Sequence, residues 1–195
     1  MQLIRRLRRI ALRQFVGPAF LVLVSLFVGG LIGEVMIRLV APQIFPIHPP
    51  GMYVEDPDLG YVLSPGFSGV LERPEFRDTI EIGEFGFRGA SPRAKGENSL
   101  TVLVLGDSQA FGFGTAEDET YSVLLEQMLA AAHPGTDVQV LNGGVPGYGT
   151  ADQLALLESR GPAVDPDLVI VTFLSVNDLV ENLTPASTWA RVEDG

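Results

Sequence analysis

The chain has 195 residues, no cysteine and two histidines, and its formal net charge at pH 7 is −11. The lack of cysteine excludes disulfides and thiolate metal sites, and His48 and His133 do not have the spacing of metal ligands. An acidic chain of this kind offers no basic surface for phosphate groups, which argues against a nucleic-acid partner. We therefore expect no cofactor, no metal site and no nucleic acid.

Charge divides the chain into a short basic start and a long acidic remainder. Five arginines lie within the first 13 residues, whereas residues 42–195 contain 7 basic and 23 acidic residues. The basic segment 1–14 precedes a mostly apolar stretch, residues 15–41, and about 20 apolar residues cross the hydrocarbon core of a membrane as a helix. Because basic flanks stay cytoplasmic, we predict a single-pass anchor in the inner (cytoplasmic) membrane with a periplasmic main domain. The alternative is a cleaved signal peptide, whose apolar region is normally about 7–15 residues.

The predicted anchor also offers a contact surface. Gly29 and Gly33 form a G-x-x-x-G pattern, which lets a second membrane helix approach closely. We expect the lipid bilayer as one partner, and other membrane-protein subunits through this helix face and the extracytoplasmic domain. Residues 42–51 contain four prolines and are predicted to form an extended linker in which His48 is exposed. Residues 52–98 are predicted to be β-rich and irregular.

Residues 99–195 alternate between strand and helix patterns, which predicts an α/β domain. Short apolar runs bounded by turn residues indicate buried strands, and apolar residues spaced three and four apart indicate helices. The alternation implies parallel strands joined by right-handed crossovers. In chain order we predict a strand at 100–105, a helix with Tyr121, Leu124, Leu125 and Met128 on one face, a strand at 138–141, a glycine-rich loop at 142–149, a helix from Thr150 to Gly161 with Ala151, Leu154 and Leu157 facing inward, and a strand at 168–173.

Each predicted strand ends in a loop that carries a reactive or polar group. Ser108 follows the first strand, the glycine-rich loop the second and Asn177 the third. The carboxyl ends of parallel strands meet at one sheet edge, where such folds bind ligands. A serine beside glycine N–H groups and a side-chain amide is an arrangement suited to acyl transfer. The alternative is that residues 106–108 form only a turn and a helix cap, and residues 177–178 only a turn.

Three segments resemble the sequence blocks of the SGNH (GDSL-type) hydrolase family. They are the Gly-Asp-Ser of 106–108, the glycine-rich residues 142–147 and the Val-Asn-Asp of 176–178. The proline-rich linker, residues 56–61 and the Phe-Gly-Phe-Arg-Gly of 85–89 are similar to membrane-anchored bacterial members. The resemblance implies a flavodoxin-like three-layer α/β/α domain, here partial and C-terminally incomplete, in residues 99–195.

The resemblance also implies roles for single residues. Ser108 would be the nucleophile, and Gly147 and Asn177 would be oxyanion donors, with Gly144 as the alternative glycine. The family's last block, an Asp-x-x-His that supplies the general base, does not occur in this sequence. Without a base, a serine hydroxyl is a weak nucleophile.

Two hypotheses follow, and we favour the first at this stage. The chain is a pseudoenzyme, a non-catalytic scaffold subunit of a larger bacterial membrane complex, in which a partner covers the open edge of the sheet. Alternatively, it is the N-terminal part of a serine esterase or O-acetyl transferase that acts on cell-envelope carbohydrate esters, with a missing C-terminal part supplying the histidine.

Overall fold

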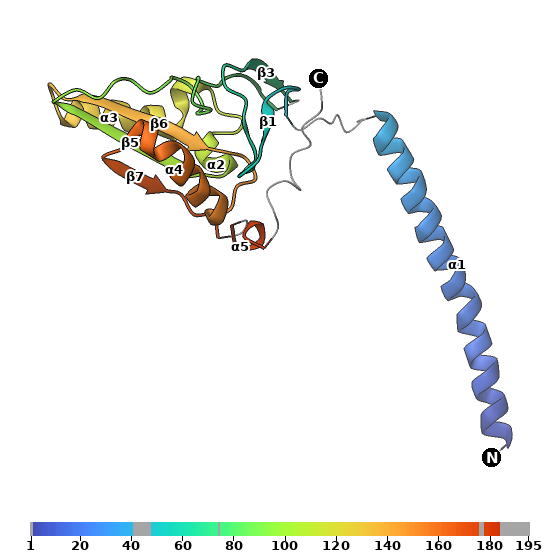
Figure 1. Ribbon diagram of the computed structural model, residues 1–195. Helices are drawn as coiled ribbons and strands as arrows, with labels where there is room; N and C mark the ends of the chain where they lie inside the picture. The colour runs from blue at the N-terminus through green and yellow to red at the C-terminus, as the bar shows by residue number, and fades with distance from the viewer. Residues whose placement is uncertain (1, 41–47, 74, 176–177, 184–195) are drawn as a thin grey trace. The chain divides into compact units, whose positions relative to one another are not determined.

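The computed structural model describes residues 2–40, 48–73, 75–175 and 178–183. The chain divides into two compact units, Met1–Pro46 and Ile47–Gly195. Helix α1 forms the first unit, and the strands and the remaining helices belong to the second (Figure 1).

Helix α1 runs over Gln2–Val40. Its segment Val16–Val40 has 25 residues and a mean hydropathy of 2.4, and none of this segment is buried within the chain. A Cβ atom added to Gly29 or Gly33 would meet nothing within 4 Å. At a rise of 1.5 Å per residue, the segment is about 37 Å long and exceeds a hydrocarbon core of ~30 Å. The helix is thus long and apolar enough to cross a membrane, a property that N-terminal signal sequences share.

Two antiparallel hairpins begin the second unit. The first turn is closed by the Asp56 carboxylate, whose Oδ1 accepts from the N–H groups of Asp58 and Leu59, both over 3.0 Å. Gly60 then adopts a positive φ of 74°, which glycine tolerates without strain. The hairpins pair β1 (Tyr53–Asp56) with β2 (Gly60–Leu63), and β3 (Ser68–Glu72) with β4 (Arg77–Glu81).

A three-stranded parallel sheet forms the centre of the second unit. Its strands are β5 (Ser99–Gly106), β6 (Asp137–Gly144) and β7 (Leu168–Val171), in the spatial order β6-β5-β7. The described helices around it are α2 (Ser108–Phe111), a 3-10 turn (Glu117–Glu119), α3 (Tyr121–Ala132), α4 (Thr150–Val164) and α5 (Asp178–Glu181).

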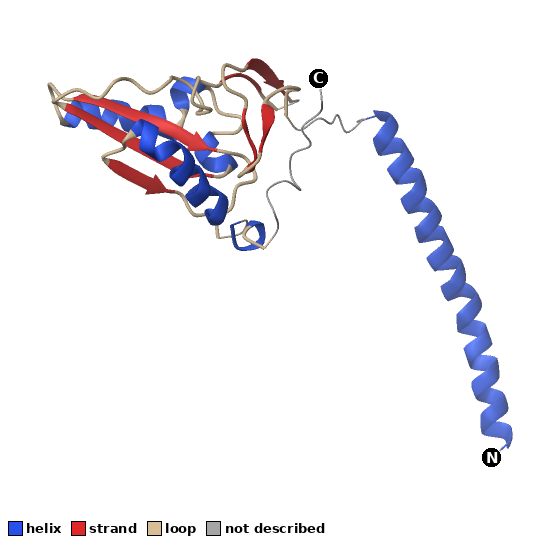
Figure 2. Cartoon of the chain, in the orientation of Figure 1, coloured by secondary structure: helices blue, strands red, loops and turns tan. Residues whose placement is uncertain are grey.

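Helices cover both faces of this sheet (Figure 2). Successive side chains of a strand point to opposite faces, and β5 is buried on both. Leu103 belongs to the hydrophobic cluster that contains Leu156 of α4, whereas Val102 belongs to the cluster against which Leu125 of α3 packs. The α/β class and the parallel sheet predicted from the sequence are therefore confirmed.

Of the apolar face predicted for α3, only Leu125 packs against the core. Tyr121, Leu124 and Met128 are exposed, and it is Leu125 and Leu129 that pack against the sheet. The helix is apolar around most of its circumference, so the 3.6-residue spacing alone does not determine which side is buried.

The face predicted for α4 is correct only in part. Leu157 packs against the core, but Ala151 and Leu154 are exposed. The buried residues of this face include Leu156 and the polar Gln153. A polar residue was not expected there; its side-chain amide donates to the Tyr148 carbonyl over 3.4 Å, while its Oε1 has no hydrogen-bond partner within the described residues.

Helix α4 also continues beyond its predicted end at Gly161 and Pro162, as far as Val164. It stops at Asp165, which adopts a left-handed conformation with φ 48° and donates its N–H to the Gly161 carbonyl over 2.8 Å. Gly161 itself is buried, and a Cβ there would approach Leu157 to 3.0 Å. The glycine therefore serves close packing inside the helix rather than its termination.

Candidate active site

The loops that follow the three parallel strands meet at one edge of the sheet. Strand β6 continues through Gly144, three residues beyond its predicted end, and Gly144 pairs with Gly106, the last residue of β5. Beyond the strands, the N–H of Val145 donates to the Gly106 carbonyl over 3.0 Å, and the N–H of Thr172 donates to the Leu105 carbonyl over 2.8 Å. The predicted convergence of the loops after β5, β6 and β7 is thus present.

Ser108 is the first residue of α2, directly beyond the sheet edge. The helix is capped by Asp107, whose Oδ1 accepts from the N–H of Gln109 over 2.8 Å. Ser108 is half-buried, and its hydroxyl forms no hydrogen bond within the described part of the chain. The interpretation of residues 106–108 as a turn and helix cap is therefore correct for Asp107, while the serine hydroxyl remains available.

Two glycines let α2 lie directly on the ends of the strands. A Cβ on Gly106 would collide with the Thr172 hydroxyl and would lie 2.5 Å from the Ala110 Cβ. A Cβ on Gly144 would collide with the backbone of Phe111. These distances are shorter than real carbon contacts, so both positions need glycine because of close approach rather than because of their backbone angles.

The glycine-rich loop after β6 is a tight turn. The N–H of Tyr148 donates to the Val145 carbonyl over 3.1 Å, and Gly147 has a φ of 85°, a conformation that favours glycine. The N–H of Gly144 is already engaged, since it donates to Asn142 Oδ1 over 3.0 Å. This contact favours Gly147 over Gly144 as the oxyanion glycine, a role that stays a prediction.

The third predicted site residue, Asn177, lies outside the described residues. Its neighbour Asp178 begins α5 and is fully buried. The Asp178 carboxylate accepts from the N–H of Leu174 through Oδ2, and the Asp178 N–H donates to the Leu174 carbonyl, both over 3.0 Å. Two hydrogen bonds therefore hold Asp178 to Leu174.

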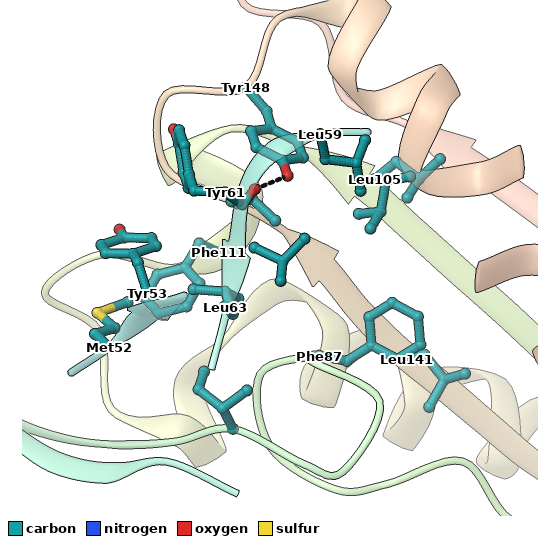
Figure 3. Close-up of a cluster of buried hydrophobic side chains, with 14 of the residues drawn as sticks. Met52, Tyr53, Leu59, Tyr61, Leu63, Phe87, Leu105, Phe111, Leu141 and Tyr148 are labelled. Carbon is teal, nitrogen blue, oxygen red and sulfur yellow. Dashed lines mark hydrogen bonds between the residues drawn. The ribbon is translucent and has the colours of Figure 1, made fainter. Parts of the chain in front are cut away.

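Two buried tyrosines connect the first hairpin to the glycine-rich turn. The Tyr61 hydroxyl of β2 donates to the Pro146 carbonyl over 2.7 Å, and the Tyr148 hydroxyl donates to the Tyr61 carbonyl (Figure 3). Their rings meet edge to face, with centroids 5.4 Å apart. Burial raises the pKa of both phenols well above the usual value, so both stay protonated donors at all ordinary pH values.

Arg88 is the most notable residue that the sequence analysis did not identify. Its side chain is completely buried, and its guanidinium carbon lies 4.8 Å from the centroid of the Phe111 ring. Within the described residues its guanidinium donates five hydrogen bonds, to Asp78 Oδ2 (2.9 Å), Glu117 Oε2 (2.9 Å) and the backbone carbonyls of Phe111 (3.0 Å), Gly112 (2.6 Å) and Thr115 (2.7 Å).

These contacts make Arg88 a positioning residue for the serine. Phe111 and Gly112 form the C-terminal end of α2, the helix that begins with Ser108. Asp107 holds one end of this short helix and Arg88 holds the other. The sequence offered no signal for this role, because an arginine between aromatic residues and glycines in residues 85–89 is equally compatible with a surface position.

Three carboxyl groups that the sequence analysis did not connect also meet near Ser108. Asp107, Asp178 and Glu181 are buried, and one oxygen of each lies within 4.8 Å of one oxygen of the others. Burial, together with the nearby Asp107 carboxyl, raises the pKa of Asp178 and of Glu181 above the usual values. A sequence signal existed only for Asp178 and Glu181, whose three-residue spacing places them on one side of a helix.

Neither histidine is hydrogen-bonded to Ser108 in the described structure. His48 is half-buried rather than exposed as predicted, because its ring packs edge-on against Tyr53 and Phe113, and its Nδ1 lies 3.2 Å from the Tyr53 hydroxyl. Burial lowers its pKa to about 4, so the ring is neutral at pH 7. His133 ends α3 beside the start of β6, at the opposite sheet edge from Ser108.

Comparison with known proteins relates this site to a family. Residues 104–194 match the sequence model of the GDSL-like Lipase/Acylhydrolase family. Among solved structures, an aspartate-to-alanine mutant of esterase AlinE4 shares 36% identity, with 48% of each chain covered and a TM-score of 0.34. AlinE4 itself, an SGNH-hydrolase family esterase, shares 35% identity with the same coverage and TM-score.

The chain thus spans about half the length of these solved structures. No curated protein matches it. The match of residues 104–194 contains the Ser108 helix, the glycine-rich turn and the start of α5. By this match, residues 104–194 are similar to the SGNH/GDSL-type hydrolase family.

Proposed function

We propose that the protein is a membrane-anchored, extracytoplasmic member of the SGNH/GDSL-type hydrolase family in which Ser108 attacks acyl esters of cell-envelope carbohydrates. The main support for the proposal is that, in the described part of the chain, the Ser108 hydroxyl is free and its helix is held in place. Its hydroxyl is free of hydrogen bonds within the described residues, and the helix that presents it is held at both ends, by Asp107 and by Arg88. A side chain kept only as a helix cap would not need this support.

In the proposed reaction, Ser108 Oγ forms a bond to the carbonyl carbon of the ester while its proton passes to a general base. The carbonyl oxygen becomes an oxyanion, which the N–H groups of Ser108 and Gly147 and the Asn177 amide stabilise. Collapse of this intermediate breaks the bond to the alcohol, which takes up the proton, and leaves an acyl-serine. Water or an acceptor alcohol then removes the acyl group.

The general base is assigned to neither histidine of this chain. His48 is held against Tyr53, and His133 lies at the opposite sheet edge. The proposal therefore requires a base from further chain or from a partner protein, and activity is expected only in the complete assembly.

A fluorophosphonate probe tests the proposal in native membranes, because it reacts with serines that are activated as nucleophiles. We expect the probe to label the wild-type chain and Ser159→Ala, which removes an exposed serine of α4, but not Ser108→Ala. Labelling of Ser108→Ala at the wild-type level would assign the reactivity to another residue and end the proposal.

The structural subunit favoured from the sequence remains the second candidate. It is supported by the positions of the two histidines and by exposed apolar side chains on β7 and α5, among them Leu168, Val171 and Leu179. For this function we expect no probe labelling in native membranes, together with extraction of the chain in mild detergent as part of a larger complex. Labelling at Ser108 would contradict it.

A further inference from the structure

The three buried carboxyl groups beside Ser108 are not satisfied by hydrogen bonds alone. Asp107 is 2% exposed, Asp178 0% and Glu181 6%. Within the described residues, Asp107 Oδ2, Asp178 Oδ1 and Glu181 Oε2 have no hydrogen-bond partner. The opposite oxygens of the two aspartates are held by backbone N–H groups, so each aspartate is fixed in orientation while one of its oxygens stays free. An unpaired buried carboxylate is strongly unfavourable.

The surroundings of the cluster increase this cost. The charged groups that act on the Glu181 carboxyl are Asp107, Asp178 and Asp152, all of which are acidic. The cluster therefore needs either protons or a cation. Protons would neutralise the carboxyls one by one, whereas a cation would bind the three free oxygens together.

The spacing of the oxygens suits a cation instead. One oxygen from each of the three carboxyls lies within 4.8 Å of the others. Oxygen ligands at about 2.3–2.6 Å from Ca²⁺ can be up to about 5 Å apart on opposite sides of the ion, and Ca²⁺ accepts irregular arrangements of carboxylates. Carboxylates are also the ligands that hard divalent cations prefer.

We propose that Asp107, Asp178 and Glu181 form a binding site for a hard divalent cation, with Ca²⁺ as the favoured ion. The ion would connect the cap of α2 to α5, and so hold the loop before α5 beside Ser108. Cysteine and histidine spacing in the sequence predicts no metal site, whereas this site uses carboxylates from two separate elements. The site does not depend on whether Ser108 is reactive.

The test uses the full chain in detergent micelles, stripped with EDTA. Equilibrium dialysis followed by metal analysis is expected to give one Ca²⁺ per chain, and the unfolding temperature is expected to rise saturably by several degrees with added CaCl₂. Glu181→Gln, which removes one ligand charge, is expected to weaken Ca²⁺ binding at least tenfold. The matched control is Glu158→Gln, which changes an exposed glutamate of α4 and is expected to bind as the wild type does.

Three results would each overturn the proposal. The first is a wild-type chain that binds no Ca²⁺, Mg²⁺ or Mn²⁺ in dialysis, a result that needs no variant to fold. The second is equal Ca²⁺ affinity in the wild type and Glu181→Gln. The third is a Glu181→Gln chain that unfolds at a higher temperature than the wild type with Ca²⁺ present. This result would show that loss of a charge, rather than a metal ion, relieves the repulsion between the carboxylates.

Discussion

The two sides of the central strand β5 are held very differently. Toward β6, eight residue pairs are in register, and the strand end is covered by α2 and the first hairpin. Toward β7, four pairs are in register, and Val171 is 53% exposed. The serine and the glycine-rich turn are therefore fixed from the β6 side of the sheet, while the β7 side contributes less to holding them.

The largest loss of stability is expected when the contacts of Arg88 on the β6 side are removed. Arg88→Met leaves the Asp78 carboxylate buried without its cation, and removal of one partner of a buried ion pair typically costs about 3–5 kcal/mol. The free energy of unfolding, measured by urea titration of the full chain in detergent, should fall by about that amount.

The matched control for Arg88 is Arg93→Met. Arg93 also pairs with an aspartate, Asp137, over 3.0 Å, but its side chain is 46% exposed. A surface ion pair contributes at most about 1 kcal/mol. Equal losses for the two variants would mean that Arg88 does not hold the serine helix in the way its contacts indicate.

Gly144→Ala should have the next largest effect. The added methyl group would collide with the backbone of Phe111, and overpacking of this kind costs about 1–3 kcal/mol. The same urea titration measures it. Gly96→Ala is the control, because a Cβ there meets nothing within 4 Å, and replacing a glycine at an unstrained position stabilises by up to about 1 kcal/mol. A neutral Gly144→Ala variant would show that α2 can move away from β6.

Tyr148→Phe should have a smaller effect. It removes the hydrogen bond to the Tyr61 carbonyl, and such a bond contributes about 0.5–1.5 kcal/mol. Tyr121→Phe, at an exposed tyrosine of α3, should leave the free energy of unfolding unchanged. If both variants unfold at the same urea concentration, the contact between the hairpin and the glycine-rich turn does not stabilise the fold.

The sequence predicts the features that depend on neighbouring residues, but not those that depend on residues far apart in the chain. The three strands and their loops were predictable because apolar runs and bounding glycines are local signals. The role of Arg88 was not, since its carboxylate partners lie 10 and 29 residues away in the chain. The carboxyl cluster was missed for the same reason, because Asp107 and α5 are far apart in the sequence and meet only in the folded structure. The buried face of α3 was unpredictable because that helix is apolar nearly all round.

The smallest effect is expected from one substitution made on the open side of the sheet. Val171→Thr keeps a β-branched residue in β7, and at a position that is 53% exposed it should change the free energy of unfolding by less than about 0.5 kcal/mol. Val104→Thr makes the same change in β5, where the side chain is fully buried, and a buried hydroxyl without a partner costs about 1–3 kcal/mol. Urea titration of both variants therefore compares the edge strand β7 with the buried central strand β5. If Val171→Thr is as costly as Val104→Thr, then β7 is covered in the folded protein, and the exposed side of the sheet is an interface rather than a free surface.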